Sequence, residues 1–228
     1  MYKLSPSDFA YLYEECKLCF YLKVKENIKR PFSPFPSVFS AMNTLIQGNL
    51  MGKSFQTLSP KLPDGIIESQ EGWVSSKQIP DTNLYISGKY DLLVKQKDGT
   101  YILVDLKISK PSEEKAEKYK TQLASYKYAL EYPASGKSIK IANQGLLVLY
   151  PNTVEFKEDK ALIDLAPTWF EVKDDTEGFL KFMKEINTLL EGVHPGETPD
   201  CPWCEYRHKG EKIAHEEKAG PVQEDIPF

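Results

Sequence analysis

The chain has 228 residues, of which 41% are hydrophobic and 12% aromatic, and its formal net charge is -4. This is enough for one domain with a sizeable core, and the net charge excludes a polycationic protein. The charge is uneven, however, because positions 1–150 contain 20 basic and 15 acidic residues, whereas positions 151–228 contain 9 basic and 18 acidic residues. A nucleic-acid surface would therefore be a local patch in the first two-thirds of the chain.

Two helices are predicted at the N-terminal end. Ser5 and Asp8 give a helix-start signal before apolar residues at helical spacing, which predicts a helix over about residues 5–25. A proline-rich loop over 29–37 separates it from a second helix over 38–55.

After residue 72 the pattern becomes that of strands, joined by a "KDG" hairpin turn. The predicted elements are strands over 73–80, 84–96 and 101–107, a helix over 111–132, strands over 144–151 and 168–172, and a helix over 175–192. This order predicts a mixed α/β fold, with a central mixed sheet flanked by helices. We expect one domain over residues 1–208 and a flexible acidic tail over 209–228.

The most informative stretch is the predicted hairpin that carries Asp91, Asp105 and Lys107. Asp105 and Lys107 share a face because side chains alternate along a strand. A two-residue turn would put Asp91 and Asp105 on opposite faces of the hairpin. A three-residue loop over 97–99, with Gly99 in the left-handed conformation, places Asp91 directly opposite Asp105. We predict the second register, or a bulge of equal effect.

Two carboxylates that face each other repel unless a cation lies between them, and oxygen ligands of this kind select Mg²⁺ or Mn²⁺. Such a metal activates water and stabilises charge on a phosphate, and Lys107 could hold or deprotonate that water. The alternative is a solvated face with an ordinary exposed lysine. Against it, Asp105 interrupts an apolar run, where an unpaired acid is costly.

Three motifs together resemble the PD-(D/E)xK nuclease superfamily, in its RecB-like branch related to the CRISPR-adaptation nucleases with a cysteine-bound metal cluster. They are Gly88-x-x-Asp91, Asp105-x-Lys107 and Gln122-x-x-x-Tyr126. The resemblance covers residues 5 to about 207 and implies a restriction-endonuclease-like fold. It also implies a metal-dependent DNA nuclease that processes single strands or DNA ends in repair, recombination or CRISPR-type adaptation.

The resemblance also assigns roles to these residues. Asp91, Asp105 and the Leu106 carbonyl would hold Mg²⁺ or Mn²⁺, and Lys107 would position or activate the water. Gln122 and Tyr126 share a helix face and would orient the DNA or the lysine.

One feature departs from the family pattern. Active members usually have a His or an acid on the helix before the sheet, but here Asn43 is the residue nearest that position, with Gln47 one turn on. An amide oxygen is a weaker ligand than a carboxylate. A second hypothesis is therefore a catalytically weak, nuclease-like DNA-binding or adaptor module.

The four cysteines form two Cys-x-x-Cys pairs, Cys16 with Cys19 and Cys201 with Cys204. No stretch could span a membrane and the N-terminus is too polar for a signal peptide, so we expect a cytoplasmic protein with reduced thiols. The spacing then predicts a four-thiolate metal site, with disulfides or unrelated cysteines as the alternative. The family favours a [4Fe–4S] cluster, and the two-plus-two division favours Zn²⁺.

Basic and aromatic residues give a candidate DNA surface around the predicted site. The basic residues are Lys17, Lys23, Lys25, Lys29, Arg30, Lys107, Lys110, Lys115, Lys118, Lys120 and Lys127. Four aromatics could stack single-stranded bases, namely Tyr11, Tyr13, Phe20 and Tyr21. The alternative is that the lysines are solvated helix faces and the aromatics are core.

The chain ends in "QEDIPF", which resembles the acidic tip of bacterial single-stranded-DNA-binding proteins. A terminal Phe with its carboxylate suits an apolar pocket with a basic rim on a protein partner. The alternatives are packing on the protein's own core and occupation of its own basic DNA groove.

Overall fold

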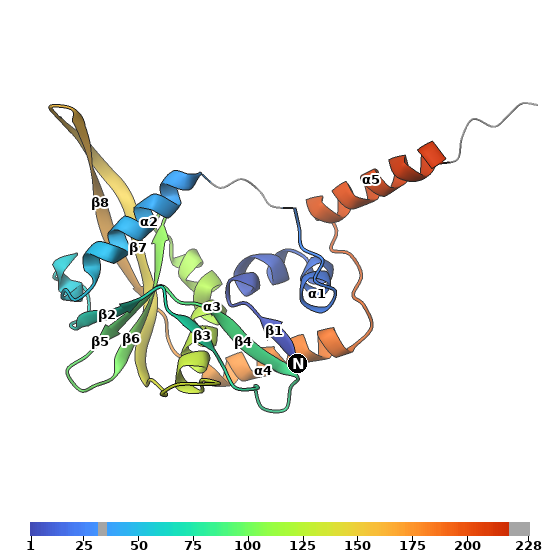
Figure 1. The fold of residues 1–228 in the computed structure, drawn as a ribbon, viewed down its shortest axis with the longest axis horizontal. Coiled ribbons are helices and arrows are strands. Elements are labelled where there is room, and N and C mark those ends of the chain that lie inside the picture. The colour runs from blue at the N-terminus through green and yellow to red at the C-terminus, as the bar shows by residue number, and fades with distance from the viewer. Residues whose placement is uncertain (32–35, 219–228) are drawn as a thin grey trace, which may run out of the picture.

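The computed structural model describes residues 1–31 and 36–218, and Figure 1 shows that helices surround the strands. The strands form two sheets. The strands are β1 (Tyr2–Leu4), β2 (Ile66–Gln70), β3 (Trp73–Ser75), β4 (Leu84–Lys89), β5 (Leu92–Lys95), β6 (Tyr101–Ile108), β7 (Ile141–Lys157) and β8 (Lys160–Glu171). The α-helices are α1 (Lys17–Lys25), α2 (Ser37–Leu50), α3 (Glu113–Glu131), α4 (Thr176–Glu191) and α5 (Pro202–Lys218). Shorter helical turns cover Phe9–Tyr13 and Phe55–Thr57.

The larger sheet has five strands in the order β2-β5-β6-β7-β8, and the smaller has three in the order β1-β4-β3. In the larger sheet β6 and β7 pair in parallel while the other pairs are antiparallel. The predicted mixed α/β fold, with a mixed sheet flanked by helices, is confirmed.

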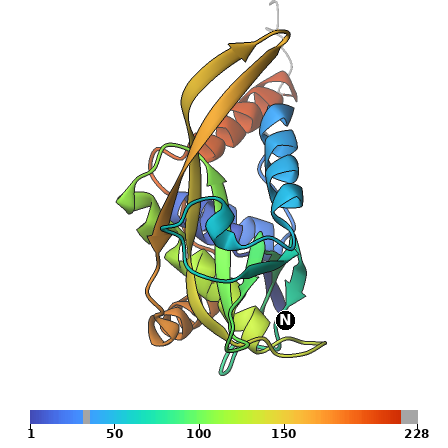
Figure 2. The same cartoon turned by 90° about the vertical axis from the view of Figure 1, so that its left-hand side faces the viewer.

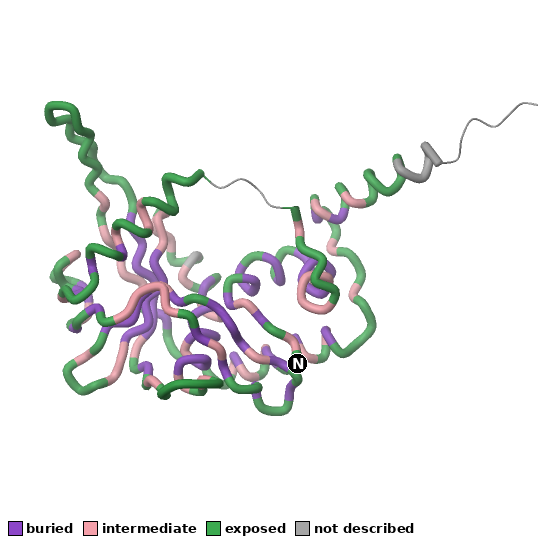
Figure 3. The backbone as a smooth tube through the Cα atoms, in the orientation of Figure 1, coloured by how far each residue is buried: buried purple, intermediate pink, exposed green. Residues whose placement is uncertain are grey.

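The larger sheet is covered on both faces, as the end-on view in Figure 2 and the buried strands in Figure 3 show. On one face Ile102, Val104 and Leu106 of β6 belong to a cluster that extends to Leu50 at the end of α2. On the other face Leu103 belongs to the main core, which includes Leu123 of α3. Since side chains alternate, Asp105 and Lys107 of β6 share the face of Leu103, toward α3.

The predicted first helix is interrupted at Cys16. Its backbone is extended, with φ of -160°, and its sulfur accepts a hydrogen bond from the Cys19 N–H, so Cys16 caps a new helix, α1. The short strands predicted over 144–151 and 168–172 are parts of β7 and β8, a long ribbon that projects beyond the sheet in Figure 1.

The prediction of a flexible tail from residue 209 is wrong for its first part. Helix α5 continues to Lys218, and an ion pair of 2.5 Å between Glu205 and Lys209, one turn apart, supports the helix. Residues 219–228, with the "QEDIPF" motif, and residues 32–35 of the proline-rich loop lie outside the described residues.

Candidate active site

The β5–β6 hairpin has the register that brings the two carboxylates together. Leu92 pairs with Val104, so the preceding Asp91 lies across from Asp105. The loop has three residues, because the Gln96 N–H donates to the Thr100 carbonyl at 2.8 Å. The predicted three-residue loop is thus confirmed, with Gly99 in the left-handed region at φ of 84°.

Asp105 is buried and contacted on both oxygens. Its Oδ1 accepts a hydrogen bond of 2.7 Å from Nε2 of Gln122, and its Oδ2 lies 2.7 Å from Nζ of Lys107. Opposite, Oδ2 of Asp91 accepts a 2.7 Å hydrogen bond from the Leu106 N–H. The structure therefore brings Asp91, Asp105, Lys107 and Gln122 into one cluster at the end of the hairpin.

The electrostatics of this cluster favour a bound cation. Burial, together with the charge of Asp105, raises the pKa of Asp91 to about 7. Burial also raises the pKa of Asp105, although Lys107 and Gln122 oppose it. Burial alone would lower the pKa of Lys107, but the charges of the two carboxylates outweigh it and raise that pKa. Lys107 therefore stays protonated, and a further cation would relieve the repulsion between the acids.

Tyr126 lies on α3 one turn after Gln122, but it contacts the backbone rather than a carboxylate. Its hydroxyl donates to the Lys89 carbonyl at 2.7 Å. A Cβ at Gly88 would come within 3.2 Å of the Tyr126 ring and 2.9 Å of Pro6. Gly88 is thus required because α3 approaches β4 closely, and Tyr126 fixes the strand that leads to Asp91.

On its other side the cluster opens into a hollow of about 460 Å³ that Asn43 of α2 lines together with Asp91 and Lys107. The sequence placed Asn43 nearest the family's helix-ligand position, and its side chain does face the site. Its Oδ1 accepts a 3.1 Å hydrogen bond from Nε2 of the buried Gln47. The hollow is therefore lined by the amide of Asn43, and a carboxylate or an imidazole at this position would be a stronger metal ligand.

Tyr119, which no sequence motif singled out, lines the same hollow. The Lys107 ammonium lies 4.8 Å from the centre of its ring, and its hydroxyl bonds that of Tyr11. The signal was present, because Tyr119 precedes Gln122 by three residues on the same face of α3.

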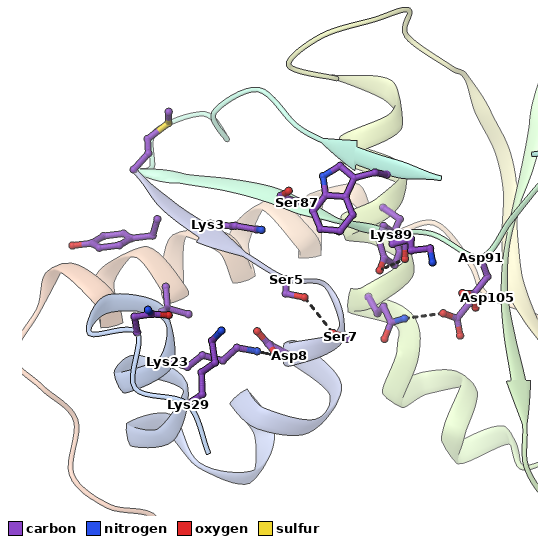
Figure 4. Close-up of a pocket in the computed structure, with 18 of the residues that line it drawn as sticks. Lys3, Ser5, Ser7, Asp8, Lys23, Lys29, Ser87, Lys89, Asp91 and Asp105 are labelled. Carbon is purple, nitrogen blue, oxygen red and sulfur yellow. Dashed lines mark hydrogen bonds and ion pairs between the residues drawn. The ribbon is translucent and has the colours of Figure 1, made fainter. Parts of the chain in front are cut away.

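A larger cleft of about 950 Å³ leads away from the carboxylates on the opposite side. Six lysines line it against three aspartates, and Figure 4 shows Lys3, Lys23 and Lys29 across the cleft from Asp91 and Asp105. The lining lysines are Lys3, Lys23, Lys25, Lys29, Lys89 and Lys107.

Of the basic residues predicted to contact DNA, Lys23, Lys25, Lys29 and Lys107 line this cleft. Lys120 and Lys127 pair with Asp175 and Asp174 instead of lining the cleft. The prediction that four aromatics stack bases is wrong for three of them, because the apolar core buries Tyr13, Phe20 and Tyr21. Tyr11 remains 45% exposed.

The four cysteine sulfurs converge between α1 and the start of α5, and all lie within 4.8 Å of one another. Three of the pairs are Cys16 with Cys204 at 3.7 Å, Cys19 with Cys204 at 3.8 Å, and Cys19 with Cys201 at 3.9 Å. These separations exclude disulfides, so the alternative of two bridges is wrong here. The predicted four-cysteine site, joining the two ends of the fold, is confirmed as a cluster of thiols.

The donor chemistry of this cluster fits a metal. Burial alone would raise the pKa of Cys16, but hydrogen bonds from the Cys19 and Thr198 backbone lower it to about 6. Nη2 of Arg30 lies 3.7 Å from Sγ of Cys201 and adds positive charge beside the thiols. Four buried thiolates would still repel one another, and a bound cation removes that repulsion.

A profile of the PD-(D/E)XK nuclease superfamily matches residues 55–208. A solved structure of SSO0001 is similar at 13% identity and a TM-score of 0.48, over 84% of this chain and 77% of that one. No curated protein matches the chain, and no helix in the described part is long and apolar enough to cross a membrane. The chain belongs to the PD-(D/E)XK nuclease superfamily.

Proposed function

We propose that this chain is a Mg²⁺- or Mn²⁺-dependent deoxyribonuclease that acts on single strands or DNA ends. The observation that carries the proposal is the pair of the half-buried Asp91 and the buried Asp105, with Lys107 at 2.7 Å from Asp105, in a lysine-lined cleft. A structural ion pair would need one acid per lysine, whereas here two acids and one lysine share the site. The imbalance supports a divalent cation.

The ion would be held by Asp91, Asp105 and the Leu106 carbonyl. When bound, it would activate water and stabilise negative charge on the phosphate. The protonated Lys107 neutralises charge that develops on the phosphate and orients the attacking water through its N–H groups. Gln122 keeps the Asp105 carboxylate in one orientation through its 2.7 Å hydrogen bond. Tyr126 holds the backbone of Lys89 and so positions the segment before Asp91.

The test is incubation of labelled single- and double-stranded DNA with Mn²⁺, comparing the wild type with Asp105→Ala and Lys107→Ala. We expect both variants to lose cleavage. A matched control is Lys95→Ala, since Lys95 lies on the same hairpin but pairs with the exposed Glu68. Cleavage that survives both substitutions would sink the assignment.

A catalytically weak DNA-binding or adaptor module is the second candidate, and Asn43 is the observation that favours it. Its amide lines the hollow beside Asp91, and Gln47 already occupies its carbonyl. Asn43→Asp would add a carboxylate to the site. If the wild type binds DNA without cleaving it and Asn43→Asp cleaves, the adaptor reading is correct.

For the cysteine site we propose a single tetrahedral ion, Zn²⁺, rather than the [4Fe–4S] cluster that the family resemblance favoured. Around one metal with bonds of about 2.3 Å, the edge of a thiolate tetrahedron is about 3.8 Å. Three sulfur pairs lie at 3.7, 3.8 and 3.9 Å, and all four sulfurs lie within 4.8 Å of one another. A cubane cluster would hold its thiolates further apart, because four irons lie between them.

We also propose that the terminal Glu-Asp-Ile-Pro-Phe segment docks on a protein partner in DNA repair, recombination or CRISPR-type adaptation in the cytoplasm. Deletion of residues 220–228 separates this from occupation of the protein's own DNA cleft. Partner docking predicts unchanged DNA binding and a lost partner, whereas self-inhibition predicts tighter DNA binding.

A further inference from the structure

Trp73 is 65% exposed and lines the lysine-rich cleft. It lies on β3, an edge strand of the smaller sheet, and the next residue, Val74, is buried in the main core. Because side chains alternate along a strand, β3 is anchored by Val74 and presents Trp73 outward. The indole therefore adds little to the core, and its place in the lysine-lined cleft distinguishes Trp73 from other exposed hydrophobic residues such as Phe156.

The surroundings of Trp73 are basic. Nζ of Lys3 lies 5.2 Å from the centre of the indole ring, and Lys89 pairs with Trp73 across the β3–β4 ladder. Lys89 is engaged with Glu71 at 2.6 Å. Lys3 forms no ion pair with any residue of the described ranges, and its ammonium is left for a ligand anion.

Trp73 is also close to the carboxylates along the chain. The Glu71 N–H donates to the Asp91 carbonyl at 2.7 Å, so these two residues are neighbours across the strands. Trp73 follows Glu71 by two residues. Both Trp73 and Asp91 line the same cleft, so a DNA strand that lies in this cleft can reach both residues.

We propose that Trp73 and Lys3 form a nucleotide subsite, in which the indole stacks on an unpaired base and Lys3 contacts the adjacent phosphate. The inference rests on the proposed nuclease function and deepens it by naming the residues that would select an unpaired base, in a single strand or at a frayed end. Inside a duplex, neighbouring base pairs cover both faces of each base, so an exposed indole can stack only on an unpaired base or on the outer face of a terminal pair. Stacking tolerates any base, so the subsite selects strandedness and not sequence.

The test measures binding of a short fluorescein-labelled oligodeoxynucleotide by anisotropy, as a single strand and as a blunt duplex, with Ca²⁺ in place of Mg²⁺. The full-length variants are Trp73→Ala, Trp73→Phe and Lys3→Ala. Phe156→Ala is the matched control, because Phe156 is 81% exposed on the β7–β8 ribbon and does not line the cleft.

We expect Trp73→Ala to weaken single-strand binding about 10-fold, as loss of one stacked base does. Trp73→Phe should retain most of the affinity, Lys3→Ala should reduce the salt dependence, and Phe156→Ala should change nothing. If the wild type binds DNA but Trp73→Ala binds the single strand as tightly, the subsite is wrong and the nuclease proposal stands. An equal loss for the blunt duplex overturns the assignment to an unpaired base. If the wild type binds neither the single strand nor the duplex, both the subsite proposal and the nuclease proposal fail.

Discussion

Gln122 on α3 donates its amide hydrogen to Asp105 on β6 over 2.7 Å, and both side chains are buried. This bond joins the helix to the strand that carries Asp105 and Lys107. It also favours the charged form of Asp105, since the amide lowers the pKa that burial raises. Gln122 is therefore a positioning residue for the carboxylate.

Gln122→Leu should weaken Mn²⁺ binding about 10- to 100-fold, because loss of a hydrogen bond to a metal ligand has effects of that size. Titration calorimetry with Mn²⁺ measures this directly. Ser125→Ala is the control, since the Ser125 hydroxyl bonds only the Thr121 carbonyl within the same helix. Equal Mn²⁺ affinity for Gln122→Leu and the wild type would mean that the bond has no role at the metal.

Asp91→Asn should stabilise the metal-free protein above neutral pH. The pKa of Asp91 is raised to about 7, by burial and by the charge of Asp105, so the folded state holds a proton that the unfolded state has lost. Stability therefore falls as pH rises from about 4 through 7. Asn carries no charge, and its carbonyl can still accept from the Leu106 N–H.

Thermal denaturation in a chelator checks this. At pH 8 the melting temperature of Asp91→Asn should exceed that of the wild type by at least about 2 °C, and near pH 4 the two should converge. Added Mn²⁺ should stabilise the wild type more than the variant. If Asp91→Asn were less stable than the wild type at pH 8, the charge of Asp91 would not destabilise the folded state.

The hairpin loop should depend on the left-handed conformation of Gly99. Its φ is 84° and a Cβ there would meet nothing within 4 Å, so Gly99→Ala costs only backbone strain, about 1 kcal/mol. Gly48 is a matched control within α2, where a Cβ also meets nothing within 4 Å. Gly48→Ala should stabilise by about 0.5–1 kcal/mol. Urea denaturation measures the change in the free energy of unfolding for both variants. If Gly99→Ala and Gly48→Ala changed it in the same direction, the loop geometry would be contradicted.

Cys201→Ser should lower both the metal content and the melting temperature, because the four sulfurs clamp the N-terminal and C-terminal segments together. We expect anaerobically purified wild type to contain one zinc per chain by elemental analysis, and His208→Ala, outside the sulfur cluster, to keep it. Iron with acid-labile sulfide would overturn the single-ion assignment.

The sequence predicted those parts of the site that depend on local rules. Strand alternation and a glycine in a three-residue loop set the register that faces Asp91 toward Asp105, and two Cys-x-x-Cys pairs predicted the thiol cluster. Spacing on α3 placed Gln122 toward the sheet. These predictions needed no knowledge of distant packing.

The parts that could not be predicted depend on tertiary contacts. Tyr13, Phe20 and Tyr21 could have been stacking or core residues, because whether an aromatic residue is core or surface depends on which elements cover it. Trp73 and Lys3 come together because β1 and β3 both flank β4, and no local pattern indicates that neighbourhood. Likewise Lys127 is held by Asp174 from a different segment.

The rate of cleavage of a labelled single strand under single-turnover conditions with Mn²⁺ tests the central claim most directly, comparing the wild type with Asp105→Asn. Asn keeps the shape of the side chain and an oxygen for the Gln122 amide but removes the charge that would hold the metal. The account predicts a rate at least about 100-fold lower with DNA binding retained. Cleavage by Asp105→Asn at the wild-type rate would contradict the assignment of this cluster as the active site.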